Sequence, residues 1–459
     1  MPLAVKRRIA RAARPLPFRS TTLIYPCFPD TNMGSSRSLP RRVLLSIILM
    51  GFAGQVAWTV ENQYFNIFLY NAVIPDPMYI SYMVALSAIV ATVTSILVGA
   101  YSDAHATRWG RRKPYLLFGY PIWGVVTALF PTAALLRPAV LAAWVAILWD
   151  CIMTFFGSTA YDANFNAYVV DVTTVENRGL VTGIVSLLGS VSLILIYAFA
   201  GFFIEAFGYF AFFYLVGAIV SALGTLGALL VVEPPHRAER GSGVLSRIRE
   251  SFSAEFVKKH KDVFLILLAS GIQGMGYQVY FPYILLYIQH YLGFPLHLAS
   301  LVVFVAILSG ILAAVPAGIL VDRFGRRAVA LIALPLNCAS VFALSFARGL
   351  LDAIALGIAW VSSSSVLGVA VGAWLRDLYP EEKRGEFSGY TILFNVAFTM
   401  VPGPLIGSLL IHAFGERRLI NGEEAVIPAP VIFQVGAAIA LLSILPMLRV
   451  KETLQKKES

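Results

Sequence analysis

The sequence predicts an all-α integral membrane protein with twelve transmembrane helices in two related halves of six. Three observations carry this prediction. The chain of 459 residues is 58% hydrophobic and only 13% charged, with a mean hydropathy of +0.76. Soluble proteins average about 25% charged residues. The other two observations are a series of long apolar segments and a pair of polar motifs that recurs in the second half.

Twelve apolar segments can each cross a bilayer, because each approaches or exceeds the ~20 residues that a transmembrane helix needs. The expected spans are 43–70, 78–102, 114–136, 138–170, 179–207, 209–232, 263–290, 297–321, 328–347, 350–378, 387–413 and 430–448. A polar stretch separates the sixth segment from the seventh. We therefore expect an N-terminal six-helix bundle, a cytoplasmic linker, a C-terminal six-helix bundle and a short cytoplasmic tail, over residues 41–232, 233–262, 263–449 and 450–459.

Residues 1–40 precede the first helix. They are rich in arginine, contain one acid, Asp30, and have no apolar run long enough for a signal peptide. Three interpretations stay open for this segment: a disordered basic cytoplasmic tail, a true translation start at Met33, or an organelle transit peptide.

Basic residues gather on one side of this predicted topology. The even number of helices places both termini on the same side, and 31 of the 35 Lys and Arg residues lie on that side. Cytoplasmic loops carry such an excess, so we expect a multi-pass protein of the cell membrane with both termini in the cytoplasm. These loops also explain the net charge of +10, and no nucleic-acid partner is expected.

One polar motif occurs once in each half. A glycine is followed four residues later by an aspartate and then by a Gly-Arg-Arg triplet, within residues 99–112 and again within 318–327. A second motif, an aspartate with an arginine seven residues later, occurs at 171–178 and 377–384. Such charges suit a cytoplasmic gate of ion pairs that opens and closes, although they could also fix only the topology. The gate residues are Asp103, Arg111, Arg112, Asp171, Arg178, Asp322, Arg326, Arg327, Asp377 and Arg384.

The sequence lacks the usual features of enzymes and metal proteins. The three cysteines lie far apart and the six histidines are scattered, so neither a disulfide framework nor a metal site is expected. No Walker loop is present, which excludes ATP as the direct energy source. Gly-x-Ser-x-Gly and His-Glu-x-x-His are also absent, so we expect no enzyme activity and no cofactor.

Three acids lie inside apolar segments: Glu61, Asp150 and Asp162. An ionisable residue costs about 2.5–3.5 kcal/mol at the bilayer centre, so each is a candidate for function. Asp162 is the strongest, because polar residues recur every four positions around it. This stripe comprises Thr154, Ser158, Asp162 and Asn166. We expect it to face a cavity rather than lipid, and the alternative is a buried structural acid bonded to its neighbours.

Glu61 lies in a polar and aromatic stretch of the first helix. Trp58 shares its face, and Asn62 and Asn66 share the adjacent face. Aromatic rings stack on the CH faces of a sugar while amides bond to its hydroxyls, so this stretch suits a sugar site. The alternative places Glu61 at the outer membrane interface. Asp150 is a weaker candidate, because it lies 12 residues before Asp162, hence about 120° away around the fourth helix, and nearer the outside.

The seventh predicted helix opens the second half with an aromatic and polar face. Gln273, Tyr277 and Tyr280 share this face, and nearby glycines and Pro282 predict a bent helix. The alternative is helix packing or an interfacial aromatic belt. Asn395 in the eleventh helix is a further candidate. The predicted substrate- or cation-binding residues are therefore Trp58, Glu61, Asn62, Asn66, Ser158, Asp162, Asn166, Gln273, Tyr277, Tyr280 and Asn395.

The duplicated loop motif is similar to the cytoplasmic loop signature of the major facilitator superfamily. In the first copy Asp103 and Gly110 are seven residues apart, against three in the second copy. This extension, with the Gly-Arg-Arg-Lys-Pro that ends it, resembles the glycoside–pentoside–hexuronide cation symporters and the related sucrose transporters. Residues 161–165, with Asp171 and Arg178 after them, resemble the fourth helix of the melibiose-type members.

The resemblance covers roughly residues 40–450. It implies two pseudo-symmetric six-helix bundles, a central sugar site, alternating access and a monomer. It also places Asp103 at the start of the eleventh helix and Arg111 near Asp171. The second-half counterparts that it implies are Asp322, Arg326 and Asp377.

The sequence thus predicts a secondary transporter for a sugar or glycoside. The melibiose-type sodium site uses paired acids on the second helix, and residues 77–102 contain none, so a proton is the expected partner. Lys and Arg are absent from the depth of the apolar segments, which disfavours a doubly anionic substrate. Two alternatives stay open: transport of a non-sugar small neutral or cationic metabolite, and a transport-inactive sensor on the same fold.

Overall fold

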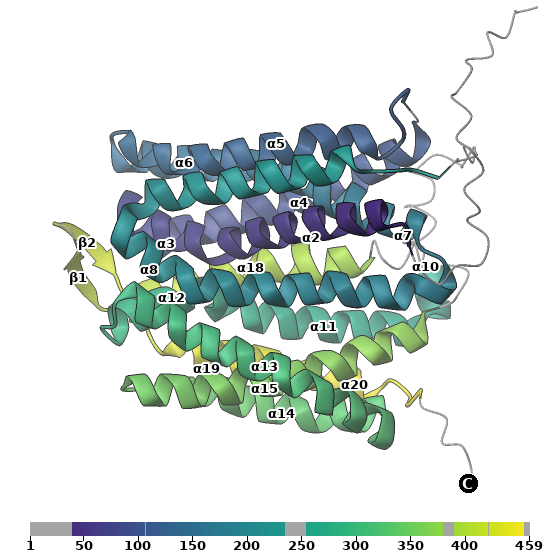
Figure 1. Ribbon diagram of the computed structural model, residues 1–459. Helices are drawn as coiled ribbons and strands as arrows, with labels where there is room; N and C mark the ends of the chain where they lie inside the picture. Colours follow the sequence, from purple (N-terminus) through teal and green to yellow (C-terminus); the bar gives the residue numbers. More distant parts are fainter. Residues whose placement is uncertain (1–38, 106, 235–253, 380–389, 421, 454–459) are drawn as a thin grey trace, which may run out of the picture. The chain divides into compact units, whose positions relative to one another are not determined.

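The computed structural model describes residues 39–453 except for 106, 235–253, 380–389 and 421. Long helices run side by side, and one small β-hairpin lies at one end of the bundle (Figure 1). Nearly all of the N-terminal tail, most of the linker between the halves, and Arg384 lie outside the described residues.

The first half consists of helices that several times continue through π-helical or 3₁₀ segments, labelled η. Asp76 caps α4, because its carboxylate accepts a hydrogen bond from the Met78 backbone N–H at 2.8 Å. The elements are α2 (Arg41–Val60), η1 (Glu61–Phe65), α3 (Asn66–Phe68), η2 (Leu69–Val73), α4 (Pro77–Ala104), α5 (Lys113–Leu129), η3 (Phe130–Leu135), α6 (Ala139–Gly157), η4 (Ser158–Phe165), α7 (Asn166–Val172) and α8 (Val175–Leu229).

The second half follows the same plan after a short helix at the end of the linker, α10 (Ala254–Lys259). Its elements are α11 (Lys261–Tyr280), η5 (Phe281–Tyr283), α12 (Ile284–Leu286), η6 (Tyr287–Tyr291), α13 (Leu296–Phe324), α14 (Arg326–Leu344), α15 (Leu350–Leu378), η8 (Leu393–Ala397), α17 (Phe398–Met400), α18 (Pro402–Phe414), β1 (Arg417–Ile420), β2 (Glu423–Val426), α19 (Val431–Leu441) and α20 (Ile444–Leu448). The two strands pair antiparallel, with Arg417 opposite Val426.

The described residues contain 11 helical runs that are long and apolar enough to cross a membrane. One of them, Glu176–Leu229 in α8, has 54 residues and is too long for one crossing. It would measure about 80 Å at 1.5 Å per residue, against ~30 Å of hydrocarbon core. The backbone leaves the helical conformation at Gly208, where φ is 83° and ψ is 168°. The chain turns there, α8 supplies two crossings, and the prediction of twelve transmembrane helices is confirmed.

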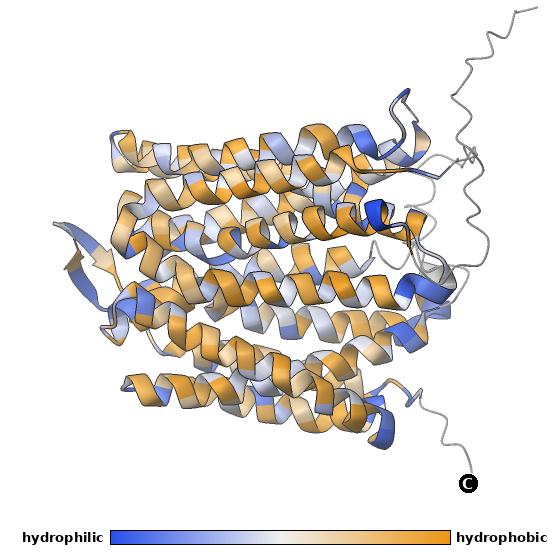
Figure 2. Cartoon of the chain, viewed as in Figure 1, coloured by the Kyte–Doolittle hydropathy of each residue, from blue (hydrophilic) through white to orange (hydrophobic). Residues whose placement is uncertain are grey.

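Hydrophobic residues cover the length of the helices, and hydrophilic residues gather at the two ends of the bundle (Figure 2). Glycines allow close helix crossings in both halves. A Cβ atom on Gly276 of α11 would lie 2.4 Å from the Gly436 carbonyl oxygen of α19. A Cβ atom on Gly124 of α5 would lie 2.3 Å from the Gly217 carbonyl oxygen of α8. Backbones touch at these crossings, as small residues allow in membrane helix pairs.

The halves meet where α4 packs on α18 and α8 packs on α13. Side-chain hydrogen bonds between the halves gather at the end of the bundle where α4 begins, which we call the closed end. They include bonds that join Gln63 to Phe281, Tyr64 to Ser300, Asn66 to Pro282, Asn71 to His290, Asp76 to His412 and Glu205 to His297. The other end, where α4 finishes and the Gly-Arg-Arg motifs lie, is called the motif end.

Candidate functional site

Four predicted gate residues meet at the motif end of the first half. Arg111 Nη2 lies 2.6 Å from Asp171 Oδ2, as the sequence resemblance implies. Arg112 pairs with Asp103, and its Nη1 donates a hydrogen bond to Ser102 Oγ at 2.6 Å. The Arg112 side chain is only 4% exposed, so this cation is held by carboxylates and a hydroxyl inside the protein.

Glu233, which follows α8, completes this cluster. Its carboxylate accepts hydrogen bonds from the backbone N–H groups of Arg111, Arg112 and Lys113, at 2.6, 2.8 and 2.6 Å. These N–H groups belong to the start of α5, where no helical partner exists and the helix dipole favours a negative charge. Gly110 has a φ of 114°, and a Cβ atom there would lie 2.6 Å from Glu233 Oε1. Both the backbone and the carboxylate therefore require glycine at this position.

The second half repeats this arrangement. Arg326 Nε lies 2.9 Å from Asp377 Oδ2. Glu452 accepts hydrogen bonds from the backbone N–H groups of Arg326 and Arg327, at 3.1 and 2.9 Å, at the start of α14. Gly325 has a φ of 96°, and a Cβ atom there would lie 2.6 Å from Glu452 Oε2. Each half therefore combines an Arg–Asp pair with a glutamate on a helix N-terminus.

Some predicted gate residues have other partners. Arg178 Nε donates to Thr173 Oγ1 at 3.4 Å, because its side chain folds back over the break between α7 and α8. The Arg327 guanidinium donates to the Leu448 carbonyl oxygen at 2.9 Å. Asp322 lies 3.4 Å from Arg326, one turn along the chain, and is largely exposed. The implied contact of Asp103 with the start of the eleventh helix falls at residues outside the described ranges.

Predicted binding residues of the first half line a cavity of about 290 Å³. The polar and aromatic part of its wall comprises Trp58, Glu61, Asn62, Thr154, Asp162 and Asn166. Ile392, Val396 and Met400 line it from the second half. Ser158, a residue of the predicted stripe, is fully buried and is not part of this wall.

Asn66 lies apart from the cavity wall, contrary to the sequence interpretation, whereas Glu61 is part of that wall. Asn66 does not line the cavity, because its amide donates to the carbonyl oxygens of Asn62 and Pro282, at 2.9 and 3.4 Å, where the halves meet. Glu61 lies inside the bundle and not at an outer interface. Its Oε1 accepts a hydrogen bond from Thr154 Oγ1 at 2.9 Å.

Asp150 is closer to the site than its position on the fourth helix suggests. It is 1% exposed, and it lies one helical turn before Thr154, whose Oγ1 donates to Glu61 Oε1 at 2.9 Å. Asp150 is not part of the cavity wall, although Thr154, four residues later, is. The sequence pattern describes one helix, and it could not reveal a partner on another.

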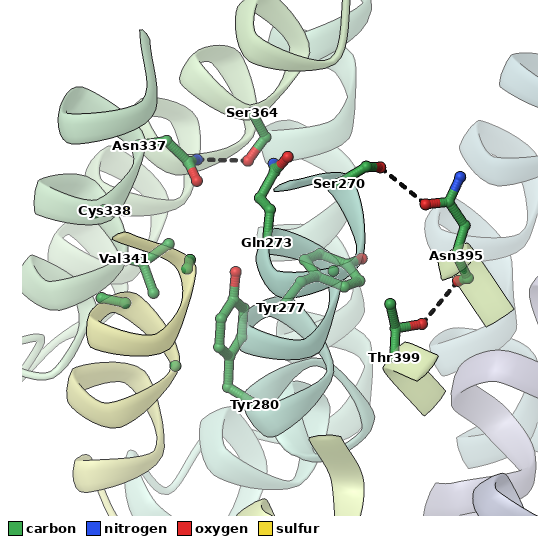
Figure 3. Close-up of a pocket in the computed structure, with 14 residues that line it drawn as sticks. Ser270, Gln273, Tyr277, Tyr280, Asn337, Cys338, Val341, Ser364, Asn395 and Thr399 are labelled. Atoms are coloured by element: carbon green, nitrogen blue, oxygen red, sulfur yellow. Dashed lines mark hydrogen bonds between the residues drawn. The ribbon is translucent and has the colours of Figure 1, made fainter. Parts of the chain in front are cut away.

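The second cavity, of about 240 Å³, lies within the second half (Figure 3). Gln273, Tyr277, Tyr280 and Asn395, all predicted site residues, line it. Ser270 Oγ donates to Asn395 Oδ1 at 2.8 Å.

A residue that the sequence analysis does not assign, Asn337, lines the opposite side of this cavity. Asn337 Nδ2 donates to Ser364 Oγ at 2.6 Å (Figure 3). Its signal in the sequence is weak, because it is a lone amide in an otherwise apolar helix.

Three predicted site residues lie in π-helical segments: Glu61 in η1, Asp162 in η4 and Asn395 in η8. A π-helical turn inserts an extra residue into the helix, and such turns are frequent at functional sites. The cavities they line hold amides, hydroxyls, aromatic rings and carboxyls. Neither wall contains a Lys, Arg or His among the described residues.

A sequence model of the Major Facilitator Superfamily matches residues 43–284 and again residues 266–459. The chain belongs to the Major Facilitator Superfamily. It is therefore a multi-pass membrane transporter and not an enzyme.

Curated relatives of this major facilitator include Multidrug resistance protein 2 of Bacillus subtilis (strain 168). The identity is 24% over 336 residues, which are 72% of this chain and 79% of the relative. Membrane-associated transporter protein of Homo sapiens is 28% identical over 170 residues, which are 34% of this chain and 31% of that protein.

Two solved structures share the fold. Nucleoside transporter NupG superposes with a TM-score of 0.64 at 14% identity, covering 89% of this chain and 100% of that one. The D-xylose-proton symporter superposes with a TM-score of 0.63 at 16% identity, covering 90% and 97%. At these identities the likeness concerns the major facilitator fold alone.

Glu233 and Glu452 are gate residues of this major facilitator that the sequence analysis does not assign. Their separation along the chain equals that of Asp103 and Asp322. The internal repeat therefore extends to them, and this equal spacing is the signal that could have identified both.

We expect Glu233→Gln to lower the stability of the protein by about 1 kcal/mol, because it removes the negative charge from the start of α5. The measurement is thermal unfolding of the purified protein in detergent. Glu416→Gln is the control, because Glu416 is 60% exposed and pairs only with a neighbouring surface arginine. Equal melting temperatures for the two variants would refute the capping role.

Proposed function

We propose that this transporter carries a sugar or glycoside across the cell membrane by alternating access, in symport with a proton. The observation that carries the proposal is the chemistry of the two central cavities. Together they combine Trp and Tyr rings with amides and hydroxyls. The first-half cavity also contains two acids, and neither cavity has a basic side chain among the described residues. Rings that stack on CH faces and amides that bond hydroxyls suit a neutral polyol better than an anion.

The resemblance of the loop motif and of residues 161–178 to the glycoside–pentoside–hexuronide symporters and sucrose transporters supports the same substrate class. One of the fold neighbours is, by its title, a D-xylose-proton symporter. We further propose that the protein works as a monomer with its motif end and both termini in the cytoplasm. The structure then corresponds to a state closed to the outside.

Uptake of a panel of radiolabelled sugars into proteoliposomes tests this function. A proton gradient or a sodium gradient is imposed in separate reactions, and liposomes without protein give the background. We expect one sugar or glycoside to accumulate only when the outside is acidic. Accumulation driven only by sodium would refute proton coupling, and no sugar uptake under either gradient would refute the substrate class.

A small cationic metabolite is the second candidate substrate. The charged side chains of the cavity walls are the acids Glu61 and Asp162, which would attract a cation. Two curated relatives are named multidrug resistance proteins. Organic amines added to the same uptake panel separate this candidate from the sugar.

A further inference from the structure

Two histidine–carboxylate pairs join the halves at the closed end. His412 Nε2 lies 2.9 Å from Asp76 Oδ1 and connects the end of α18 with the start of α4. His297 Nδ1 lies 2.6 Å from Glu205 Oε2 and connects the start of α13 with α8, just before the break at Gly208. The four side chains are between 27% and 36% exposed, so protons from the solvent can reach both pairs.

Each carboxylate also lies at the N-terminus of a helix, where the helix dipole favours a negative charge. Asp76 accepts a hydrogen bond from the Met78 backbone N–H of α4 at 2.8 Å. Glu205 accepts one from the His297 backbone N–H of α13 at 3.0 Å. His412 lies in the last turn of α18, where the dipole favours a positive charge. The helix ends therefore hold both carboxylates in place for their imidazole partners.

The internal repeat relates the two pairs to each other. His297 follows Asp76 by 221 positions, and His412 follows Glu205 by 207. The two motif pairs at the other end of the bundle are 219 and 206 positions apart. A histidine in the second half thus stands where the first half has an acid, and each acid binds the histidine of the other pair of equivalent positions. An accidental surface contact would have no such counterpart.

Tyrosines from neighbouring elements surround the two pairs. Tyr70 of η2, Tyr79 of α4 and Tyr283 of η5 lie around Asp76. Tyr209 lies beside Glu205, and Tyr64 of η1 bonds to Ser300, one turn after His297. Phenols stay neutral near pH 7, so these groups do not exchange protons there.

The remaining polar groups near the pairs have partners of their own. His290 of η6 lies 2.8 Å from the amide oxygen of Asn71, which is a neutral partner. The hairpin that follows α18 carries charges of both signs, which pair within it as Arg417 with Glu424 and Arg418 with Glu416.

Protonation of the two imidazoles changes the strength of both contacts. A protonated imidazole forms an ion pair with a carboxylate, whereas a neutral one keeps only a hydrogen bond. Histidine is the side chain that changes charge between about pH 5 and pH 8. Opening of the closed end separates the partners, so the bound protons stabilise the closed state more than the open state. This stabilisation is present at acidic pH and is lost as the pH rises.

We propose that Asp76, Glu205, His297 and His412 form a second gate of this transporter, at the closed end, which acid closes and alkali releases. Two protonated imidazoles hold the halves together there, and their deprotonation lets this end open. The proposal rests on the alternating access of the proposed function and on no particular substrate.

The distance between two spin labels at the closed end, measured by pulsed electron paramagnetic resonance, reports this opening. The labels are attached to Leu135→Cys and Arg348→Cys, which are exposed positions of the first and second half, after the three natural cysteines are replaced by serine. We expect one main distance at about pH 5 and an additional longer one at about pH 8. The ratio of open to closed molecules should rise roughly five- to tenfold, as expected for two exposed ion pairs.

The double variant His297→Gln/His412→Gln, carrying the same labels, is the decisive comparison. Glutamine keeps a hydrogen-bonding amide but does not titrate, so the longer distance should be present to the same extent at both pH values. His105→Gln is the matched control, because His105 is an exposed histidine at the motif end that stacks on Tyr101. This control should keep the pH response of the natural protein.

Label distances that do not change between the two pH values in the natural protein would overturn the proposal. A pH response that survives in the double variant would also overturn it, as would opening at acidic instead of alkaline pH. Gel filtration and melting temperature establish that the variants are folded. If the double variant is not, His297→Gln and His412→Gln are measured singly, and each should lose part of the response. A sugar panel without uptake would refute the proposed substrate class and leave this distance measurement unaffected.

Discussion

Bridging positions 76 and 412 through introduced cysteines is expected to stop transport completely and reversibly. Asp76 Oδ1 and His412 Nε2 lie 2.9 Å apart and connect the start of α4 with the end of α18 across the two halves. The proposed alternating access requires the closed end to open in each cycle, so a covalent bridge there would trap one state. Uptake of the identified substrate is measured before treatment, after treatment and after reduction.

The bridge is made with a short bis-methanethiosulfonate reagent in Asp76→Cys/His412→Cys. The natural cysteines Cys27, Cys151 and Cys338 are first replaced by serine, so that the reagent reacts only at the closed end. Each single-cysteine variant, treated in the same way, is the matched control and should keep its uptake. Full uptake in protein whose bridge is shown to be complete by mass would mean that this end does not open during transport.

Replacing Gly276 by leucine is expected to have the largest effect on stability. A Cβ atom at this position would lie 2.4 Å from the Gly436 carbonyl oxygen and 2.7 Å from the Ala440 backbone nitrogen. Both contacts are with backbone atoms, which cannot rotate away as a side chain can. Separating α11 from α19 to admit the side chain should cost about 3 kcal/mol. The measurement is the melting temperature in detergent, together with the yield of monodisperse protein.

Gly318→Leu is the matched control for this prediction. Gly318 lies within α13, and a Cβ atom there would meet no atom within 4 Å. The same substitution should therefore be tolerated, and leucine favours a helix more than glycine does. Similar melting temperatures for the two variants would contradict the close approach of α11 and α19.

The repeat and the membrane spans could be predicted from the sequence because their signals are local. A span requires about 20 apolar residues whatever its neighbours are. The loop motifs stand out because charges between apolar runs are few. The contact of Arg111 with Asp171 could be expected only through the resemblance to a family, since 60 residues separate them. The sequence also indicated the break at Gly208, because the predicted spans 179–207 and 209–232 meet at this residue.

The sequence by itself thus determined the twelve crossings, the duplication and the acids inside the membrane. Only the tertiary structure decided which side chains surround these acids. Packing of α6 on the first helix brings Thr154 to Glu61, and packing of the halves withdraws Asn66 from the cavity. Glu233 reaches the start of α5 from more than 100 residues away, with a separation of 122 from Arg111. Such pairings depend on how helices pack, and helical periodicity within one segment carries no information about the neighbour it will meet.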